Sequence, residues 1–232
     1  MLTTKRTQTS SETSLRILVV GANGATGRIV TAELAARGHT VTAFVRRPDA
    51  MGDSLPKNVR VVVGDVMQQA DVDRAMPGHD AVVVALGIRE NALKVRLFGS
   101  SATAMNVRSR GTQHVVDAMR RHGVHRLVVQ TTYGVSETHE KLSWIWKLIF
   151  RLILQPQIED SERQEHVVHD SGLDWVLVRP VGLNDTPTPG PVLVSLEGET
   201  RSMSVSRLAV ADVLVDATQR EAYVHQRLAV SA

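Results

Sequence analysis

The stretch Leu15-Arg-Ile-Leu-Val-Val-Gly-Ala-Asn-Gly-Ala-Thr-Gly27 decides the fold of this chain. Its first six residues form an apolar run typical of a buried parallel strand, and Ile29 to Ala36 places apolar residues at helical spacing. Gly21, Gly24 and Gly27 therefore lie in the turn between a strand and a helix. In that position backbone N–H groups approach a pyrophosphate closely, and the helix N-terminus attracts it. The turn predicts a dinucleotide site; the alternative is a tight turn that needs glycine for positive φ.

Composition predicts one globular domain. The 232 residues are 43% hydrophobic and 22% charged, enough for one substantial core and too apolar for wholesale disorder. The absence of cysteine excludes disulfides, thiolate metal sites and cysteine nucleophiles. Residues 1–14 are rich in Ser and Thr and lack an apolar core, so we expect a mobile tail rather than a signal peptide or a membrane span. The expected domain is 15–232, and the expected compartment is the cytoplasm.

The charge of the chain does not indicate a nucleic-acid partner. The formal net charge is +3, and the chain has 3 Trp, 2 Tyr and 3 Phe, few of them near its basic residues. Because a basic surface without interleaved aromatics is weak support for nucleic-acid binding, we interpret the densest arginine cluster as a solvated helix face. That cluster consists of Arg108, Arg110, Arg120, Arg121 and Arg126.

Strand-like and helical segments alternate along the chain, which is typical of βαβ units. The sequence therefore predicts an α/β fold, a single doubly wound parallel sheet with helices on both faces. The expected strands are 15–20, 40–45, 59–63, 80–86, 126–130 and 174–179, and the expected helices are 29–36, 68–76, 103–122 and 159–171. After a Pro/Gly-rich stretch at 186–191 we expect two short strands, a helix near 209–218 and an edge strand at 227–231.

The segment Leu142–Leu154 holds two of the three tryptophans. Its thirteen residues are too few to span a bilayer. An amphipathic helix on a membrane surface is one interpretation. A helix that lines the substrate cleft or contacts a second subunit is favoured over it.

Residues that follow the expected strands are the candidates for coenzyme binding. Arg46 comes directly after the second strand, about 20 residues beyond the glycine turn, where an arginine suits the 2′-phosphate of NADP. The alternative is that Arg46 is a solvated turn arginine, which is also our interpretation of Arg47 beside it. Asp65 either accepts from an adenine amine or caps the next helix, and Gly87 either lets the backbone approach the nicotinamide ribose or forms a plain turn.

Thr131 and Thr132 end the fifth strand, where a hydroxyl reaches toward a nicotinamide or a substrate. Their alternative is that β-branched residues simply finish a strand. Tyr133 is a poor acid or base without a lysine partner, and position 137 is Glu. The other tyrosine, Tyr223, has an arginine at the same offset, so the Tyr-x-x-x-Lys dyad is absent.

Two other constellations are rejected. Glu162, His166 and His169 share a helix face, but the segment around them is generally charged, so a solvated face is favoured over a metal site. No metal is expected. His79 and Asp80 with Ser100 or Ser101 lack the nucleophile elbow that a catalytic triad needs.

Together these residues resemble the atypical short-chain dehydrogenase/reductase superfamily, and within it the group of NADPH-dependent flavin and biliverdin-IXβ reductases. The resemblance rests on Gly21–Gly27, on 62–66 with 69–73, and on Asp80–Gly87, and it extends over most of 15–231. It implies a Rossmann-type fold, NADP(H) as coenzyme, and a flavin-like, bilin-like or other conjugated acceptor. The implied coenzyme contacts are Gly21, Asn23, Gly24, Ala25, Thr26, Gly27, Arg46, Asp65, Val66, Ala85, Leu86, Gly87, Arg89, Thr131 and Pro180.

The sequence departs from that group at the acceptor side. The serine beside the nicotinamide is replaced by Thr132, our candidate catalytic residue, and the two pocket histidines are replaced by Ser161 and Gly182. A missing Tyr/Lys pair fits a conjugated acceptor, because charge spread over a ring is protonated by solvent. Two alternatives stay open: a non-catalytic NADP(H) sensor of NmrA type, and a reductase or isomerase for one specific metabolite. A monomer or a homodimer is expected.

Overall fold

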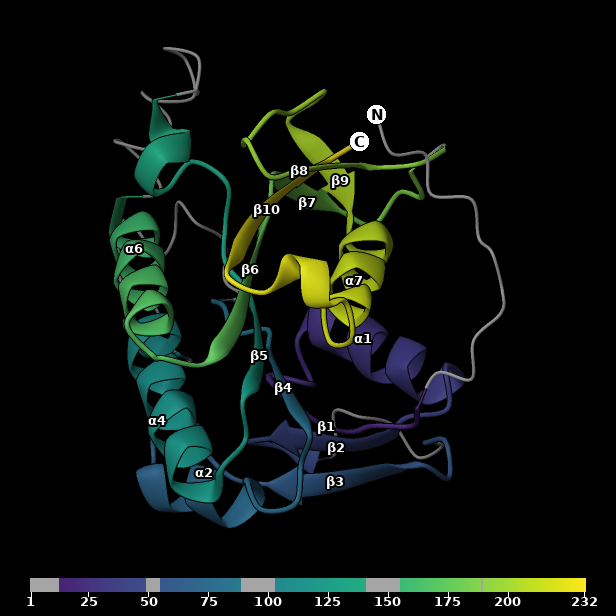
Figure 1. Cartoon of the computed structure of the whole chain (residues 1–232), viewed down its shortest axis with the longest axis vertical. Coiled ribbons are helices and arrows are strands. Elements are labelled where there is room, and N and C mark those ends of the chain that lie inside the picture. The colour runs from purple at the N-terminus through teal and green to yellow at the C-terminus, as the bar shows by residue number, and fades with distance from the viewer. Residues whose placement is uncertain (1–12, 49–54, 89–102, 141–154, 189) are drawn as a thin grey trace.

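The computed structural model describes residues 13–48, 55–88, 103–140, 155–188 and 190–232 (Figure 1). Eight strands form one sheet in the order β3-β2-β1-β4-β5-β6-β10-β8. All neighbours pair in parallel except β10 and β8, which are antiparallel. The strands are β1 (Arg16–Val20), β2 (Thr40–Val45), β3 (Val59–Val63), β4 (Ala81–Val84), β5 (Arg126–Gln130), β6 (Asp174–Pro180), β8 (Leu193–Ser195) and β10 (Gln226–Ser231). The predicted doubly wound α/β fold is confirmed.

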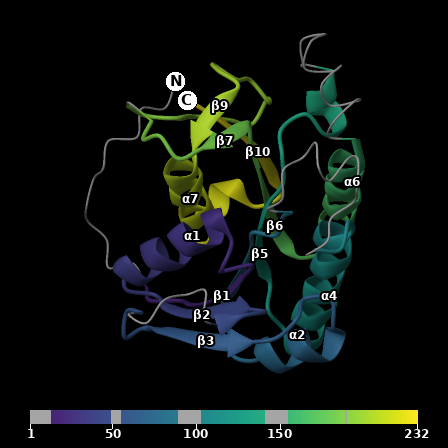
Figure 2. The same ribbon diagram turned by 180° about the vertical axis from the view of Figure 1, so that it is seen from behind.

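Helices cover both faces of this sheet (Figures 1 and 2). On one side lie α1 (Ala25–Ala36) and α7 (Arg207–Asp216), which pack against each other. On the other lie α2 (Gln69–Ala75), α4 (Val107–His122) and α6 (Gln155–His169). Short 3-10 helices, η2 (Ser136–His139) and η4 (Glu221–Tyr223), follow β5 and precede β10. A separate parallel pair, β7 (Gly182–Asn184) and β9 (Ser204–Ser206), lies beside α7.

The sheet divides the core into two apolar layers. Successive side chains of a strand point to opposite faces, so Ile17 and Val19 of β1 belong to the α1/α7 layer while Leu18 and Val20 belong to the α2/α4/α6 layer. All four are fully or almost fully buried. This explains why the strands read as continuous apolar runs rather than as alternating ones.

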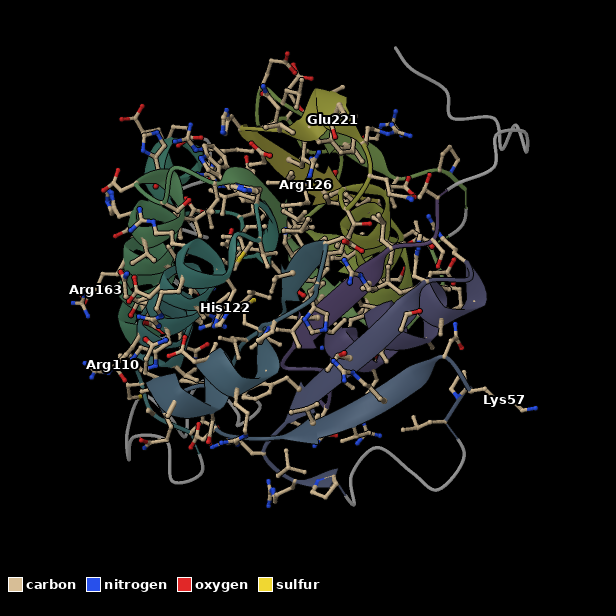
Figure 3. The ribbon with its side chains drawn as sticks, turned by 60° about the horizontal axis from the view of Figure 1, so that its bottom comes forward. Lys57, Arg110, His122, Arg126, Arg163 and Glu221 are labelled. Carbon is tan, nitrogen blue, oxygen red and sulfur yellow. The ribbon has the colours of Figure 1, made fainter. Side chains whose placement is uncertain are left out.

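Three expectations about elements are wrong. β10 is not an edge strand, because β8 pairs with its outer side and forms the edge. Residues 103–106 precede α4, with Asn106 as the residue before its first turn. Arg126 is not part of a solvated helix face: it begins β5, is 9% exposed and pairs with Glu221, whereas Arg110 points into solvent (Figure 3).

Several expectations fall outside or at the border of the described residues. The Trp-rich segment 142–154 lies outside them, as do Arg89, Ser100, Ser101 and most of the expected tail. The last two tail residues are held to the domain, since Ser14 Oγ donates to the Gly38 carbonyl at 2.8 Å and the Thr13 carbonyl accepts from Gln219. Within the ranges that the structure describes, no helix is both long and apolar enough to cross a membrane.

Candidate functional site

The turn after β1 is built so closely that side chains are excluded from it. Gly21 has a φ of 84°, and a Cβ on it would lie 2.5 Å from the carbonyl oxygen of Ala85 at the end of β4. A Cβ on Gly27 would lie 2.2 Å from the carbonyl oxygen of Gly21. Gly21 therefore needs a glycine for two reasons, its positive φ and the close approach of the Ala85 backbone.

The N-terminus of α1 is open to an anion. Gly24 precedes the helix and no side chain caps it, so the N–H groups of the first turn keep their hydrogen-bonding capacity and the positive end of the helix dipole. Beside it, Arg28 donates to the side-chain oxygen of Asn23 at 2.6 Å and fixes that amide. This is the arrangement that backbone binding of a pyrophosphate requires.

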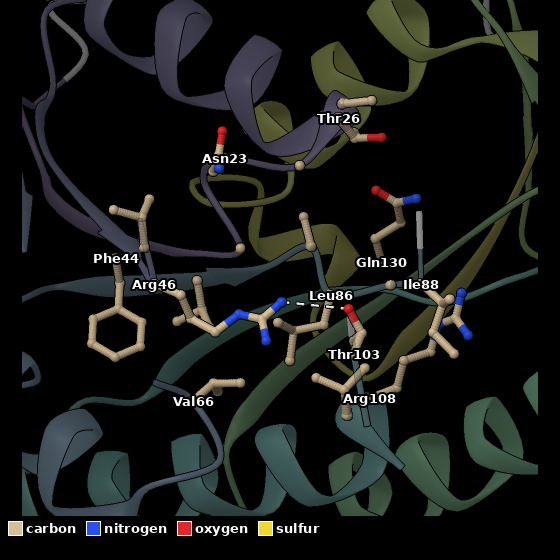
Figure 4. Close-up of a pocket in the computed structure, with 18 of the residues that line it drawn as sticks. Asn23, Thr26, Phe44, Arg46, Val66, Leu86, Ile88, Thr103, Arg108 and Gln130 are labelled. Atoms are coloured by element: carbon tan, nitrogen blue, oxygen red, sulfur yellow. Dashed lines mark hydrogen bonds between the residues drawn. The ribbon is translucent and has the colours of Figure 1, made fainter. Parts of the chain in front are cut away.

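A pocket runs along the carboxyl ends of four neighbouring strands, β2, β1, β4 and β5 (Figure 4). Phe44 and Arg46 lie toward one end of it and Gln130, Ile88 and Arg108 toward the other. Ten of the predicted coenzyme contacts line this pocket. They are Gly21, Asn23, Gly24, Ala25, Thr26, Arg46, Val66, Ala85, Leu86 and Gly87.

Arg46 leaves the end of β2 and crosses the mouth of the pocket. Its Nη2 lies 3.4 Å from Thr103 Oγ1, just before α4 begins (Figure 4). The side chain is exposed, so its guanidinium can turn toward a phosphate without being drawn out of the protein interior.

Two other predicted contacts, Asp65 and Thr131, form hydrogen bonds with other residues of the protein. The Asp65 carboxylate accepts from the N–H of Met67 at 3.0 Å, in the turn before α2, whose N-cap residue is Gln68 rather than Asp65. Thr131 donates its hydroxyl to Glu165 at 2.8 Å and is buried.

The remaining predicted contacts in the described ranges surround the pocket rather than line it. Gly27 supports the glycine turn from within α1. Pro180 ends β6, where its carbonyl accepts from the N–H of Tyr133. Thr132 is half-buried, and its hydroxyl donates only a long bond, 3.3 Å, to the Tyr133 carbonyl.

Tyr133 is a structural residue. Its ring is 3% exposed and its hydroxyl donates to the Gly198 carbonyl at 3.0 Å. Burial raises the pKa of this phenol above its ordinary value. Tyr133 is therefore even less suited to proton transfer at neutral pH than the sequence implied.

A buried ion cluster fixes the loop after β5. Arg179, whose side chain is 2% exposed, binds Glu165 of α6 through Nε at 2.9 Å and Nη2 at 2.5 Å. Its Nη1 binds Glu137 of η2 at 2.5 Å. One guanidinium thus joins β6, α6 and η2, and the hydroxyl of Thr131 adds β5 to the same cluster. The backbone around Thr132 is held from both sides as a result.

Among the pocket residues that sequence reasoning missed, Arg108 and Gln130 carry buried polar atoms. The Arg108 Nη1 and Gln130 Oε1 atoms are buried, and neither has a hydrogen-bond partner in the structure. Arg108 was assigned to a solvated face. Gln130 had a usable signal, since it directly precedes Thr131 at the carboxyl end of a strand, where ligands of α/β sheets bind.

The rejected constellations have other roles. His169 packs its ring against Trp175 with centroids 5.8 Å apart. Both ring nitrogens of His79 are bonded, to the Met76 carbonyl and to Thr42, and burial lowers its pKa. Among the described residues, no group of three or more His, Asp or Glu side chains is arranged to hold a metal ion.

Residues 21–221 match the family model described as NAD(P)H-binding. This chain belongs to that family. The matched range begins at the glycine turn and contains β2 to β9, so it covers every described residue that lines the pocket except Val20.

Relatives and solved structures agree with the family and the fold. An uncharacterised chloroplastic protein of Arabidopsis thaliana is 29% identical over 89% of this chain and 72% of its own length. A 3-diazoavenalumate denitrifying reductase of a Streptomyces species is 36% identical over 50% of this chain and 38% of its own.

A short-chain dehydrogenase/reductase of Veillonella parvula, solved with NADP, has 18% identity and a TM-score of 0.74, covering 94% of each chain. The ChuY anaerobillin reductase of Escherichia coli O157:H7 has 20% identity and a TM-score of 0.71, covering 93% of this chain and 96% of its own. At these identities the likeness supports the fold.

Proposed function

We propose that this protein is an NADPH-dependent reductase that transfers hydride to a flavin-like, bilin-like or other conjugated acceptor. The observation that carries the proposal is the pocket across the ends of β2, β1, β4 and β5, with an arginine at its first end and an open helix N-terminus in its middle. Three spacings between neighbouring strands give a length of about 14 Å, which suits an extended dinucleotide.

Different residues of the pocket bind different parts of the coenzyme. Arg46 binds the 2′-phosphate by its planar guanidinium, and the first turn of α1 with Gly24 binds the pyrophosphate. Val66, Leu86 and Gly87 line the floor between these groups and the nicotinamide end. When bound, the coenzyme supplies a hydride at its nicotinamide ring. Gln130 and Thr132 then orient that ring at the end of β5.

The protein side of the reaction is orientation rather than proton transfer. Tyr133 is committed to Gly198, and position 137, where the dyad needs lysine, holds a glutamate that binds Arg179. A conjugated acceptor tolerates this, because the charge it gains is delocalised and solvent protonates it. The denitrifying reductase of Streptomyces and the anaerobillin reductase, by their names, favour a reductase over a non-catalytic protein.

Purified protein tests the proposal directly. NADPH oxidation is followed at 340 nm with riboflavin, FMN, biliverdin and 1,4-naphthoquinone as acceptors. We expect turnover with at least one of them and a lower KM for NADPH than for NADH. Tight NADPH binding with no oxidation by any of the four would instead support the sensor of NmrA type. Absence of binding would remove both.

A further inference from the structure

Among the described residues, all the charged side chains that line the pocket are cationic. Four arginines line it and, among the described residues, no aspartate or glutamate does. The arginines are Arg46, Arg47, Arg108 and Arg207. Arg46 and Arg47 follow β2, at the end assigned above to the 2′-phosphate. Arg108 lies toward the opposite end, near Gln130 (Figure 4). The positive charge of Arg108 is therefore distant from the phosphate that Arg46 serves.

Arg108 is half-buried at the pocket wall, and no carboxylate of the described residues forms an ion pair with it. Its Nη1 is fully enclosed yet unbonded, and its Nη2 lies 3.4 Å from where a Cβ on Gly87 would stand. Burial lowers the pKa of the guanidinium from its ordinary value, which reflects the cost of enclosing this charge. An arginine stays charged in proteins, and the charge of Asp160 offsets only part of this cost, so an anion bound at the guanidinium would offset the rest.

Asp160 does not play that part. Its carboxylate accepts from the backbone N–H groups of Arg108 at 3.0 Å and Ser109 at 3.2 Å, and from the Ser109 hydroxyl at 2.5 Å. Asp160 therefore caps the N-terminus of α4 and fixes the backbone from which the Arg108 side chain starts. Asp160 thus acts on the guanidinium through its charge alone, and among the described residues the buried Nη1 of Arg108 has no hydrogen-bond partner.

Arg207 is also accounted for. It donates to Asp185 at 2.7 Å, an exposed carboxylate outside the pocket wall. Of the two arginines that do not follow β2, Arg108 is thus the one with a buried nitrogen that has no hydrogen-bond partner among the described residues. Gln130 Oε1 adds an unused acceptor at the same end of the pocket.

Resting on the proposed function, we propose that Arg108 selects acceptors that carry a carboxylate or phosphate group, binding that anion while the conjugated ring lies at the end of β5. A guanidinium binds such a group through two parallel N–H bonds, which fixes orientation as well as charge. Arg108 is then a specificity-determining residue, and the acceptor class narrows from conjugated molecules to conjugated anions.

Binding to the NADP⁺-saturated protein tests this without turnover. FMN and riboflavin share one ring system and differ by a phosphate, and biliverdin and its dimethyl ester differ by two carboxylates. We expect the wild type to bind the anionic member of at least one pair about 10 to 100 times more tightly by calorimetry. We expect Arg108→Met to abolish this preference and Arg108→Lys to retain part of it. Both variants should keep the wild-type Kd for NADP⁺ within about twofold, a smaller change than the loss of one charge-assisted hydrogen bond would cause.

Arg110→Met is the matched control, because Arg110 is exposed on the same helix and does not line the pocket. It leaves the ratio unchanged. Equal binding of both members of each pair, no binding of FMN or biliverdin, or a tenfold loss of NADP⁺ affinity in Arg108→Met overturns the inference; the last result assigns Arg108 to the coenzyme. Reduction of the neutral 1,4-naphthoquinone is scored separately, so loss of selectivity and loss of hydride transfer are distinguished.

Discussion

Arg46 is the residue on which we propose that coenzyme choice depends. Its guanidinium is exposed at the end of β2, and its Nη2 lies 3.4 Å from Thr103 Oγ1. A phosphate gained there adds charge-assisted hydrogen bonds of about 1.5–3 kcal/mol. Arg46→Ala is therefore expected to raise the Kd for NADPH about 10- to 100-fold and that for NADH less than about threefold. Fluorescence titration with each coenzyme measures both, and NADH is the internal control. Equal losses would assign Arg46 a structural role.

Gly21 and Gly38 form a matched pair for separating backbone strain from steric exclusion. Their φ angles are 84° and 86°, but a Cβ on Gly38 meets nothing within 4 Å, whereas one on Gly21 meets the Ala85 carbonyl oxygen at 2.5 Å. Alanine at either site costs about 1–2 kcal/mol for the left-handed backbone.

Gly21→Ala must in addition push β4 away from the glycine turn. We expect a larger loss of stability in urea than for Gly38→Ala and at least a tenfold higher Kd for NADPH, since a one-ångström shift there removes backbone hydrogen bonds to the pyrophosphate. Gly38→Ala keeps its coenzyme affinity. Indistinguishable affinities for the two variants would contradict the close approach at Ala85.

At the residue scale, the sequence predicted the geometry of the glycine turn but not the end of the pocket near Gln130. The glycine turn is local in sequence, so Gly21 to Gly27 carry its whole geometry. Arg108 shares a helix with exposed arginines, and only the packing of α6 against α4, with Asp160 as the cap, shows that it is enclosed. Thr131 likewise looked free until Glu165, 34 positions later, was placed beside it.

At the scale of elements, the ion cluster around Arg179 ties η2 to α6 and β6. Burial alone would raise the pKa of Glu137, but its hydrogen bond and charge interaction with Arg179 lower it below the ordinary value. Because the folded-state pKa is depressed, the stability from this carboxylate is present above the ordinary glutamate pKa of about 4.3. It is lost as the pH falls through the lower folded-state value.

Glu137→Gln tests that sign. The Glu137 side chain is 56% exposed, so solvent screens the pair and we expect a loss of about 0.5–1 kcal/mol at pH 7. The difference from wild type shrinks as the pH falls from about 4.3, where the carboxylate of the unfolded chain becomes protonated, through the lower pKa of the folded state. Urea unfolding at pH 7, 5, 4 and 3.5 measures it, with the exposed Glu140→Gln as control. A difference that grows toward acid would reverse the interpretation.

Elements with their own periodicity were predictable, whereas pairing partners were not. The expected bounds of β1 to β6 agree with the structure within one residue, except that the expected end of β4 at 86 lies two residues beyond Val84. The sequence predicts β10 as an edge strand because the strand that pairs with its outer side, β8, has only three residues and directly follows a Pro/Gly-rich stretch. Three residues carry too little pattern to reveal a pairing. The start of α6 at Gln155 was missed for a similar reason, since Pro156 suits a helix start as well as a break.

At the scale of the whole molecule, coenzyme binding and folding are linked through the pocket. Residues of β1, β2, β5 and α4 and those that directly follow β4 all line it, so the site exists only when the sheet is assembled. A ligand that binds the folded state alone adds RT ln(1 + [L]/Kd) to its stability, about 2.7 kcal/mol at 100 times Kd. For a chain of this size each kcal/mol raises Tm by about 2–4 °C.

NADPH at 100 times its Kd should therefore raise the Tm of the wild type by about 5–10 °C in differential scanning calorimetry. The rise should follow the logarithm of coenzyme concentration, and at the same concentration it should be smaller for Arg46→Ala, whose Kd is higher. NADH separates the effects, because Arg46→Ala and wild type should respond to it almost equally. A Tm that does not move with either coenzyme would mean that the pocket is not a dinucleotide site. In that event the open N-terminus of α1 would need another anion, and the reductase, the sensor and the role of Arg108 would fall together.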